Sequence, residues 1–219
     1  MTTLKLEFDR LHEIVKHVLY MLRDRGFLIS DDTYQLLPYL DGRTGTEEDY
    51  RALRDLLTQQ LQMFVNSDQT RRAIVTFYRQ SGKVPKKALT DYESILSQAN
   101  TIKHITDGIF ISEEVIGPLA KGTADIITDT YNVQFFLDEN FSYYPVGHRF
   151  TPRHEGLTDE EKITILNEQK ISFNKMPQLL ANDTIVRWYH WPVGTLVRIT
   201  RENETSRYYE YRAVVNALM

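Results

Sequence analysis

The sequence of 219 residues is long enough for one large or two small domains, and either arrangement buries a core without metals or disulfides. It contains no cysteine, which excludes disulfide frameworks, thiolate zinc sites and a thiol nucleophile. The formal net charge is −4, so we expect any nucleic-acid contact to be local rather than spread over the whole surface.

The N-terminal part begins with a predicted amphipathic helix whose apolar residues alternate in steps of four and three, and Gly26 is expected to end it. A short apolar stretch follows at 27–29, and Ser30 is typical of the N-cap of a second helix that ends near Pro38. Thr46 is expected to cap a third helix with one apolar face. The stripe of the first helix is Leu4, Phe8, Leu11, Val15, Val18 and Leu22, and that of the third is Tyr50, Leu53, Leu57, Leu61 and Phe64.

The period of the sequence changes after these helices. The β-branched and aromatic run 73–78 predicts a strand, and further runs at 108–112 and 131–137 predict two more. Between them Thr90, with Glu93 three residues later, predicts the capping box of another helix. Helices mixed with well-separated strands indicate an α/β or α+β domain over about the first two-thirds of the chain.

Turn-forming residues divide the chain into two predicted domains. We expect an N-terminal domain at 1–140, a linker at 141–147 and a C-terminal module at 148–219. The residues before His148 carry 16 Lys and Arg against 21 Asp and Glu, a net charge of −5, and the remaining residues carry 10 against 9, a net charge of +1. The nearly neutral C-terminal module is therefore better suited to docking on a partner than to electrostatic capture of a polyanion.

The C-terminal module is predicted to combine one helix with a hairpin. Thr158, followed by Glu161, is typical of a capping box at the start of a helix that carries Ile163, Leu166 and Ile171. Two runs at 196–200 and 208–215, separated by a polar turn, predict an antiparallel pair of strands.

A series of short motifs in this module occurs in one order and at nearly constant spacing. The motifs are His148, Pro152-Arg153-His154, Leu157 to Lys162, Met176-Pro177, Asn182-Asp183, Gly194, Val197-Arg198-Ile199, Arg201, Glu204 to Tyr208 and Tyr211-Arg212. The series resembles the segment that the fifth subunit of the eukaryotic nuclear RNA polymerases shares with its archaeal counterpart. Weaker matches at Arg10-Leu11, 23–27 and 108–110 are similar to the jaw domain, which is found only in the eukaryotic version.

Three positions depart from the family's pattern. The family usually has Pro where this chain has Thr184, and Gly where it has His190. The hairpin also lacks the Gly that normally precedes Arg207, which predicts a different turn because Arg does not adopt a positive φ cheaply.

The resemblance implies an α+β protein in which an N-terminal α/β jaw domain, of restriction-endonuclease-like topology, precedes a small α+β module with an antiparallel hairpin. It implies a non-catalytic subunit of a multisubunit DNA-directed RNA polymerase, without catalytic residue, metal or cofactor. The implied partners are the largest polymerase subunit, other polymerase subunits and downstream double-stranded DNA. We expect no membrane contact, no signal peptide and no homo-oligomer.

The resemblance also implies the site residues. The loop at 115–121 corresponds to the one that approaches downstream DNA in the family, where a Gly and a Pro permit close approach and a Lys meets a phosphate. The DNA-contacting residues are then Gly117, Pro118 and Lys121. The partner-binding residues are His148, Pro152, His154, Pro177, Asp183, Gly194, Arg201, Thr205, Arg207, Tyr208 and Arg212.

The origin of the chain and its location follow from the same resemblance. The departures from the family's pattern would suit a diverged paralogue or a polymerase encoded by a large DNA virus. We expect a nuclear location for a cellular protein, and the virion or the infected cell for a viral one.

Other interpretations of these residues remain open. His148 and His154 are candidate metal ligands or hydrogen-bonded junction residues, and Glu160 with Lys162 is the nuclease-type pair that a catalytic jaw would need. On a helix, residues two apart point about 200° from each other, so this pair should not converge on a metal. Two alternative functions for the chain are a free-standing transcription adaptor and a Mg²⁺-dependent nuclease that uses the jaw fold.

Basic and aromatic segments carry their own alternatives. The spots at 71–72 and 83–87 either contact DNA phosphates or are solvated loops. Tyr208, Tyr209 and Tyr211 either stack on single-stranded nucleic acid or pack in the core and a protein interface. A polar hairpin tip with Arg207 suits a bidentate contact to a partner carboxylate, or is a solvated turn.

Overall fold

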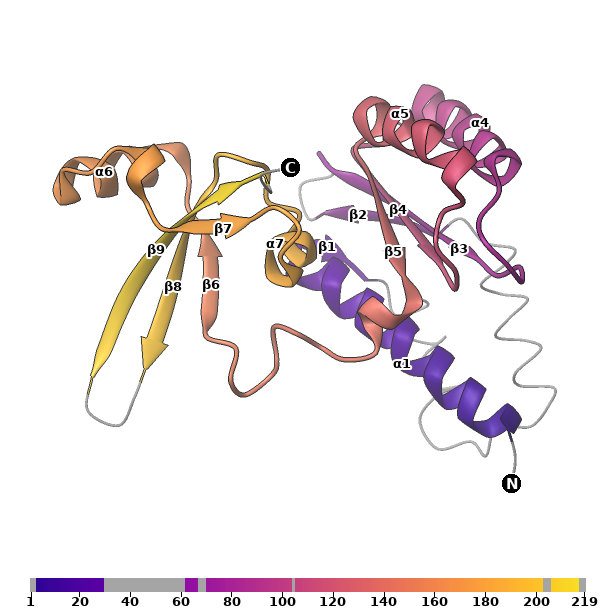
Figure 1. Cartoon of the computed structure of the whole chain (residues 1–219), viewed down its shortest axis with the longest axis horizontal. Coiled ribbons are helices and arrows are strands. Elements are labelled where there is room, and N and C mark those ends of the chain that lie inside the picture. Colours follow the sequence, from indigo (N-terminus) through magenta and orange to yellow (C-terminus); the bar gives the residue numbers. More distant parts are fainter. Residues whose placement is uncertain (1–2, 30–61, 67–69, 104, 203–205, 217–219) are drawn as a thin grey trace. The chain divides into compact units, whose positions relative to one another are not determined.

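The computed structural model describes residues 3–29, 62–66, 70–103, 105–202 and 206–216, and it divides into two compact units (Figure 1). The first unit is Met1–Tyr143 and the second is Tyr144–Met219. Each unit contains helices and a mixed sheet, which confirms the α+β class. Within the described residues no helix is long and apolar enough to cross a membrane.

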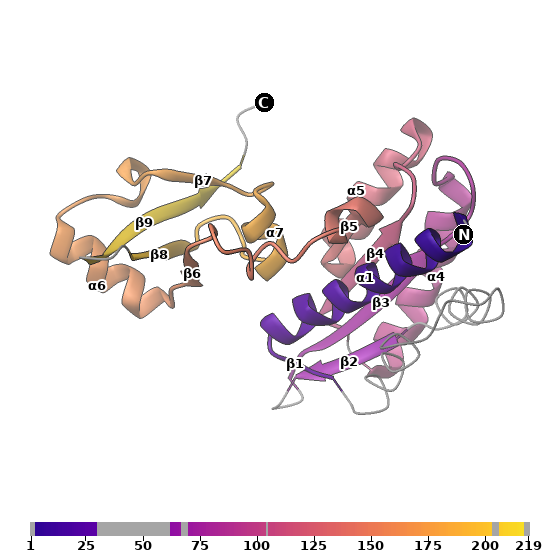
Figure 2. The same ribbon diagram turned by 90° about the horizontal axis from the view of Figure 1, so that it is seen from below.

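The N-terminal unit is built on a five-stranded sheet in the order β1-β2-β3-β4-β5. β1, β2 and β3 are antiparallel, whereas β3, β4 and β5 are parallel and are connected through helices. Figure 2 shows α4 and α5 on one face of the sheet and α1 on the other. The elements are α1 Thr3–Asp24, β1 Phe27–Leu28, β2 Gln62–Asn66, β3 Arg72–Tyr78, α4 Lys86–Lys103, β4 Asp107–Ser112, α5 Lys121–Tyr131 and β5 Val133–Leu137.

The central strands are rich in apolar residues because helices cover both faces of the sheet. Every residue of β4 is buried, as expected of a parallel strand that has helices on both sides. On the face of α4 and α5, the core is formed by residues such as Leu96 and Ile127 against Phe110. The predicted stripe of the first helix is confirmed from Leu11 to Leu22, whose apolar residues are buried, and the helix is followed by Gly26 at a φ of 85°.

Several predicted boundaries in this unit were wrong. The helix expected from Thr90 begins at Lys86, directly after Pro85, and the Thr90 hydroxyl donates to the Lys86 carbonyl at 3.2 Å instead of capping. Phe64, expected on a helical face, belongs to β2 and pairs with Ala73. Phe64 is the last apolar residue of the predicted stripe. Over so short a segment, the spacing of apolar residues does not distinguish a helix from a strand.

The segment before β5 was also misread. Tyr131 is the last residue of α5, and the strand begins only at Val133, after Asn132 has taken a left-handed conformation at φ 52°. α5 itself was not predicted, because its apolar residues are too sparse for a clear stripe. The second predicted helix, and the third up to Leu61, lie outside the described residues.

The C-terminal unit contains a four-stranded sheet in the order β6-β8-β9-β7, in which only the β7–β9 pair is parallel. The predicted hairpin is confirmed as β8 and β9, and Figure 1 shows these strands extending away from the helices. The predicted capping box is confirmed by Thr158 and Glu161, but Ile171 lies beyond the end of the helix. The elements are β6 Arg153–Gly156, α6 Asp159–Gln169, β7 Gln178–Leu180, α7 Thr184–Tyr189, β8 Leu196–Glu202 and β9 Arg207–Val215.

A helix covers each face of this sheet at the end of β8 and β9 that lies away from their turn. Val186 of α7 packs with Val197, Ile199 and Val214 on one face. Leu166 of α6 packs with Leu196 and Ala213 on the other. The outer parts of β8 and β9 extend past these two small cores.

Two of the departures from the family's pattern, at His190 and before Arg207, fall at the end of a helix and at the start of a strand. His190 ends α7 with a φ of 57°, a left-handed conformation that costs a non-glycine residue about 1 kcal/mol and explains why Gly is usual there. Gly194 has a φ of 96° in a turn that the Thr195 amide closes by donating to the Pro192 carbonyl at 3.1 Å. Arg207 begins β9 and is not among the described residues with a positive φ.

The cap of α7 yields a stability prediction. The Asp183 carboxylate accepts a hydrogen bond from the Ile185 amide at 2.8 Å, so Asp183→Ala should destabilise the C-terminal unit by about 1 kcal/mol. Thr184→Pro should be neutral or stabilising, because Thr184 is the first helical residue and Asp183 has the φ of −58° and ψ of 142° that proline permits before it. Urea denaturation checks both, and a Thr184→Pro loss as large as that of Asp183→Ala would contradict this account.

Candidate functional site

A charged cluster occupies one face of the C-terminal sheet. The register places His154 beside Ile199 and Ile199 beside Glu210, so these side chains point to the same side. Glu210 accepts from Arg201 Nε at 2.9 Å and from Arg212 Nε at 2.7 Å. One carboxylate therefore fixes two guanidinium groups on one surface.

The electrostatics of this cluster follow from its hydrogen bonds. The bond from Arg201 is the main reason why the pKa of Glu210 is lowered, and Arg212 lowers it further. Burial lowers the pKa of His154, against the opposing effects of the Pro152 carbonyl and Asp183. His154 Nδ1 lies 2.7 Å from the Pro152 carbonyl oxygen, which can only accept, so Nδ1 carries the proton.

Several of the predicted partner-binding residues meet on this face, which we call the docking face and define as His154, Arg201, Tyr208, Glu210 and Arg212. Tyr208 pairs with Arg201 across the hairpin and is 51% exposed. Two other predicted residues act on His154, because the Pro152 carbonyl and the charge of Asp183 both raise its pKa. Glu210, which joins the two arginines, was missed from the sequence, although the predicted hairpin would have placed it between them once its register was fixed.

Other predicted partner-binding residues lie elsewhere. Arg207 points to the opposite side of the sheet and pairs with Glu202 at 2.9 Å, with both side chains more than half exposed. The Pro177 carbonyl accepts from the Ala213 amide, and Gly194 serves the turn described above. His148 is exposed and its Nδ1 accepts from the Phe150 amide at 3.3 Å. Thr205 lies outside the described residues.

Metal binding receives no support from this geometry. In the part of the chain that the structure describes, no three His, Asp or Glu side chains form a group that could hold a metal ion. Lys162 Nζ donates to the Gly194 carbonyl at 2.8 Å, which fixes this lysine to a turn rather than to a site with Glu160.

The predicted DNA-contacting loop in the N-terminal unit lies beside a basic segment. Val84 and Ile116 form an isolated parallel bridge, and the Gly117 amide donates to the Val84 carbonyl at 3.0 Å. A Cβ on Gly117 would lie 3.1 Å from that carbonyl, a tight contact, so a larger residue would need the two segments to move apart by a few tenths of an ångström. The bridge thus joins the candidate basic segment 83–87 to the predicted DNA-contacting loop 115–121.

This basic surface combines lysines with two helix ends. Lys83, Lys86, Lys87 and Lys121 are all exposed, and the last three stand at the first turns of α4 and α5. Helix N-termini carry partial positive charge, so the lysines and the backbone amides both favour an anion. Leu119, between Pro118 and Lys121, is 92% exposed. We call Lys83, Lys86, Lys87 and Lys121 the basic surface.

Arg71, the other candidate for DNA contact, is engaged inside the N-terminal unit. Its Nη2 lies 2.9 Å from a carboxylate oxygen of Asp107, whose side chain is nearly fully buried. Its guanidinium also stacks over the ring of Phe27 at 4.9 Å. These contacts indicate a structural role for Arg71.

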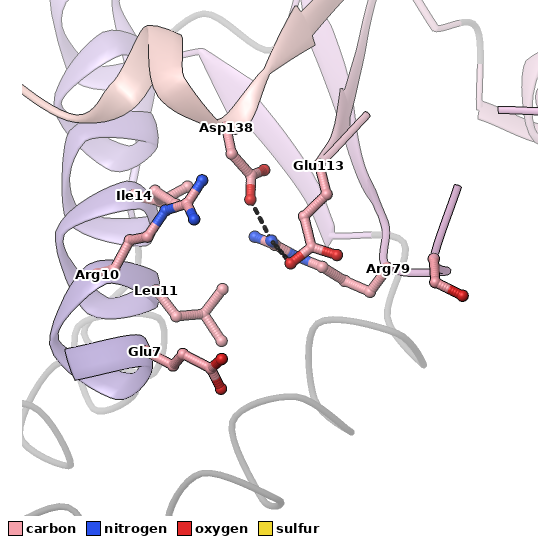
Figure 3. A pocket seen from close by; sticks show the side chains of 8 residues that line it. Glu7, Arg10, Leu11, Ile14, Arg79, Glu113 and Asp138 are labelled. Atoms are coloured by element: carbon pink, nitrogen blue, oxygen red, sulfur yellow. Dashed lines mark hydrogen bonds and ion pairs between the residues drawn. The ribbon is translucent and has the colours of Figure 1, made fainter. Parts of the chain in front are cut away.

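A pocket that sequence reasoning missed lies at the carboxyl ends of the parallel strands (Figure 3). Arg79, Glu113 and Asp138 are the first residues after β3, β4 and β5, and the register of the strands brings them together. Arg79 pairs with the buried Asp138 and lies 3.5 Å from Glu113. Burial raises the pKa of Asp138, and the Arg79 guanidinium opposes this effect. Each residue directly follows a predicted strand, which was a usable signal.

Comparison with known proteins adds independent information. Residues 145–214 match the family model described as RNA polymerase Rpb5, C-terminal domain. The chain is 27% identical over 214 residues to a subunit, RPABC1, of DNA-directed RNA polymerases I, II and III from Caenorhabditis elegans, covering 96% of this chain and 98% of the relative. It is also 27% identical to the corresponding Dictyostelium discoideum subunit, covering 95% and 99%, and to DNA-directed RNA polymerase V subunit 5A from Arabidopsis thaliana, covering 95% and 89%.

The geometry defines a protein of two α+β units, one with a charged docking face and the other with a basic surface. The comparisons then show what the chain is similar to. Its C-terminal unit matches the Rpb5 C-terminal domain, and nearly the whole chain is similar to the fifth subunits of RNA polymerases.

The buried pair in the N-terminal unit yields a second stability prediction. Asp138→Ala leaves the Arg79 guanidinium buried without its main partner, which should cost about 3 kcal/mol in the free energy of unfolding. The double variant Arg79→Leu with Asp138→Leu should cost less, because it removes both charges. Arg79→Leu and Asp138→Leu alone, measured by denaturation beside the double variant, complete a double-mutant cycle, and additive effects of these two single changes would contradict the pairing.

Proposed function

We propose that this protein is a non-catalytic subunit of a multisubunit DNA-directed RNA polymerase. Its C-terminal unit anchors to the largest subunit, and its N-terminal unit, acting as a jaw of restriction-endonuclease-like topology, contacts downstream duplex DNA. The observation that carries the proposal is the match of residues 145–214 to the Rpb5 C-terminal domain, together with relatives that align along nearly the whole chain. The location then follows the polymerase, in the nucleus for a cellular enzyme and in the virion or infected cell for a viral one.

The docking face supports the anchoring role. Arg and Tyr are enriched among the residues that dominate protein interfaces, because they combine large contact area with directed hydrogen bonds. Here Glu210 holds Arg201 and Arg212 before any partner arrives, which lowers the entropy lost on binding. Tyr208 adds an exposed ring beside them. This arrangement suits a stable protein contact more than turnover.

The basic surface supports the DNA role. It concentrates four lysines and two helix N-termini in a unit whose sequence is acidic overall, so attraction of a duplex would be confined to this site. Lysine side chains and backbone amides contact phosphates without reading base sequence, as a subunit that follows moving DNA requires.

The anchoring role predicts a face-specific effect. Tyr208→Ala should weaken binding to the large polymerase chains by about 2 kcal/mol, roughly thirtyfold, because it removes an aromatic anchor from the docking face. Tyr209→Ala is the matched control, since both rings are 51% exposed but lie on opposite faces of β9. Salt-resistant co-purification of the tagged chain measures retention. Equal loss in both variants, or retention of the Tyr208 variant, would count against this face. A wild-type chain that washes off at moderate salt would instead indicate a transient adaptor.

The DNA role predicts a salt-dependent effect without loss of assembly. Lys83→Glu combined with Lys121→Glu should shorten the lifetime of polymerase on DNA and reduce the slope of log affinity against log salt by about 0.9 for each phosphate that is no longer neutralised. Lys175→Glu, an exposed charge reversal in the C-terminal unit, serves as control. An unchanged salt slope in the double variant would remove the DNA role from the basic surface.

A further inference from the structure

An arginine-lined groove runs beside the outer part of the hairpin. It is lined by Arg149, Phe150, Pro152 and Arg153 on the β6 side and by Arg201, Glu202 and Arg207 on the hairpin. Its lining residues thus include four arginines and one glutamate. The groove overlaps the docking face only at Arg201.

Part of this positive charge is available to a ligand. Arg149 stacks over Phe150 at 4.3 Å and has no carboxylate partner among the described residues, while Phe150 is 73% exposed. Arg153 reaches Glu155, which Arg198 already binds, and the Arg153 side chain is 70% exposed. Arg207 shares an exposed pair with Glu202, which contributes little by itself. A stronger acceptor can therefore recruit these groups at low cost.

The sheet leaves an open backbone edge in the same groove. β6 pairs with β8 only as far as Arg153 and Thr200. The Leu157 amide donates to the Leu196 carbonyl, so alternate residues of β8 from Leu196 to Glu202 direct their backbone toward the β6 side. Glu202 lies past the last pair and has no strand beside it on that side within the described part of the chain. An extended segment could pair there.

We propose that this groove binds an extended, carboxylate-rich segment of a partner protein. Guanidinium forks match carboxylates in geometry, and arginine rather than lysine supplies all four cations. A segment that pairs its backbone with Glu202, at the end of β8, would place its acidic side chains at Arg149, Arg153 and Arg207, with an apolar residue against Phe150. This inference rests on the proposed function, for which it specifies the chemistry of the anchored partner.

Fluorescence anisotropy with a labelled oligoglutamate peptide and the full chain tests the groove. Arg149→Glu combined with Arg153→Glu should weaken binding by at least about tenfold, and Lys170→Glu combined with Lys175→Glu, the same charge change elsewhere in the unit, should have little effect. Arg149→Lys combined with Arg153→Lys should also weaken binding, because lysine keeps the charge but loses the fork. Circular dichroism of each variant excludes unfolding as the cause.

Three outcomes would overturn the inference. They are no peptide binding by the wild-type chain, equal loss in the control variant, and tighter binding of a single-stranded oligonucleotide of matched charge with the same dependence on Arg149 and Arg153. If the peptide does not bind but the chain still co-purifies with polymerase, only the groove is wrong. If the peptide binds but the chain does not co-purify, the proposed function fails and the groove remains.

Discussion

The register between β8 and β9 determines what the C-terminal unit can do. Because Ile199 lies opposite Glu210 and Arg201 opposite Tyr208, two arginines share one carboxylate on a single face. A slip of one residue would send Glu210, together with Arg212, to the other face of the sheet and leave Arg201 without its carboxylate. The pairing of β6 with β8 ends at Arg153 and Thr200, so the hairpin extends past β6 beside the arginine-lined groove. The docking face therefore depends on the register of β8 with β9, and the groove on where the pairing with β6 ends.

Packing at the ends of β8 and β9 away from their turn maintains this register. Each face has its own small core, with α7 on one side and α6 on the other, and both helices begin at strong N-caps, Asp183 and Thr158. The family's residues at the cap and turns have physical reasons. Pro suits the position of Thr184, and Gly suits the left-handed position that His190 occupies. This chain keeps the fold with costlier residues at both places.

Much of this architecture could be predicted from the sequence where one signal dominated. The buried runs of β3 and β4, the amphipathic α1 and the capping box at Thr158 are strong local patterns, and all were identified. α7 and β7 are too short to establish a period, and α5 has a weak stripe. Phe64 fits a helix or a strand equally well, so only pairing with β3 decides. Short elements gain their stability from tertiary packing, which a single sequence does not display.

The residues of the candidate site could likewise be predicted only in part from the sequence. The motif series identified Arg201 and Arg212, but their common acceptor, Glu210, depends on strand register. The bridge between Val84 and Ile116 likewise joins a basic segment and a DNA-contacting loop that were predicted separately. The pair of Arg79 and Asp138 followed predicted strands directly, yet only the parallel order of β3, β4 and β5 brings them together.

The central claim is that this chain works as a permanent part of a transcribing complex, held there by its C-terminal unit. Purification of the endogenous chain at high salt, followed by native mass spectrometry, tests it most directly. The account predicts one copy of the chain in a particle that contains both large polymerase chains. Recovery of the chain alone, as a monomer or a dimer, would contradict it.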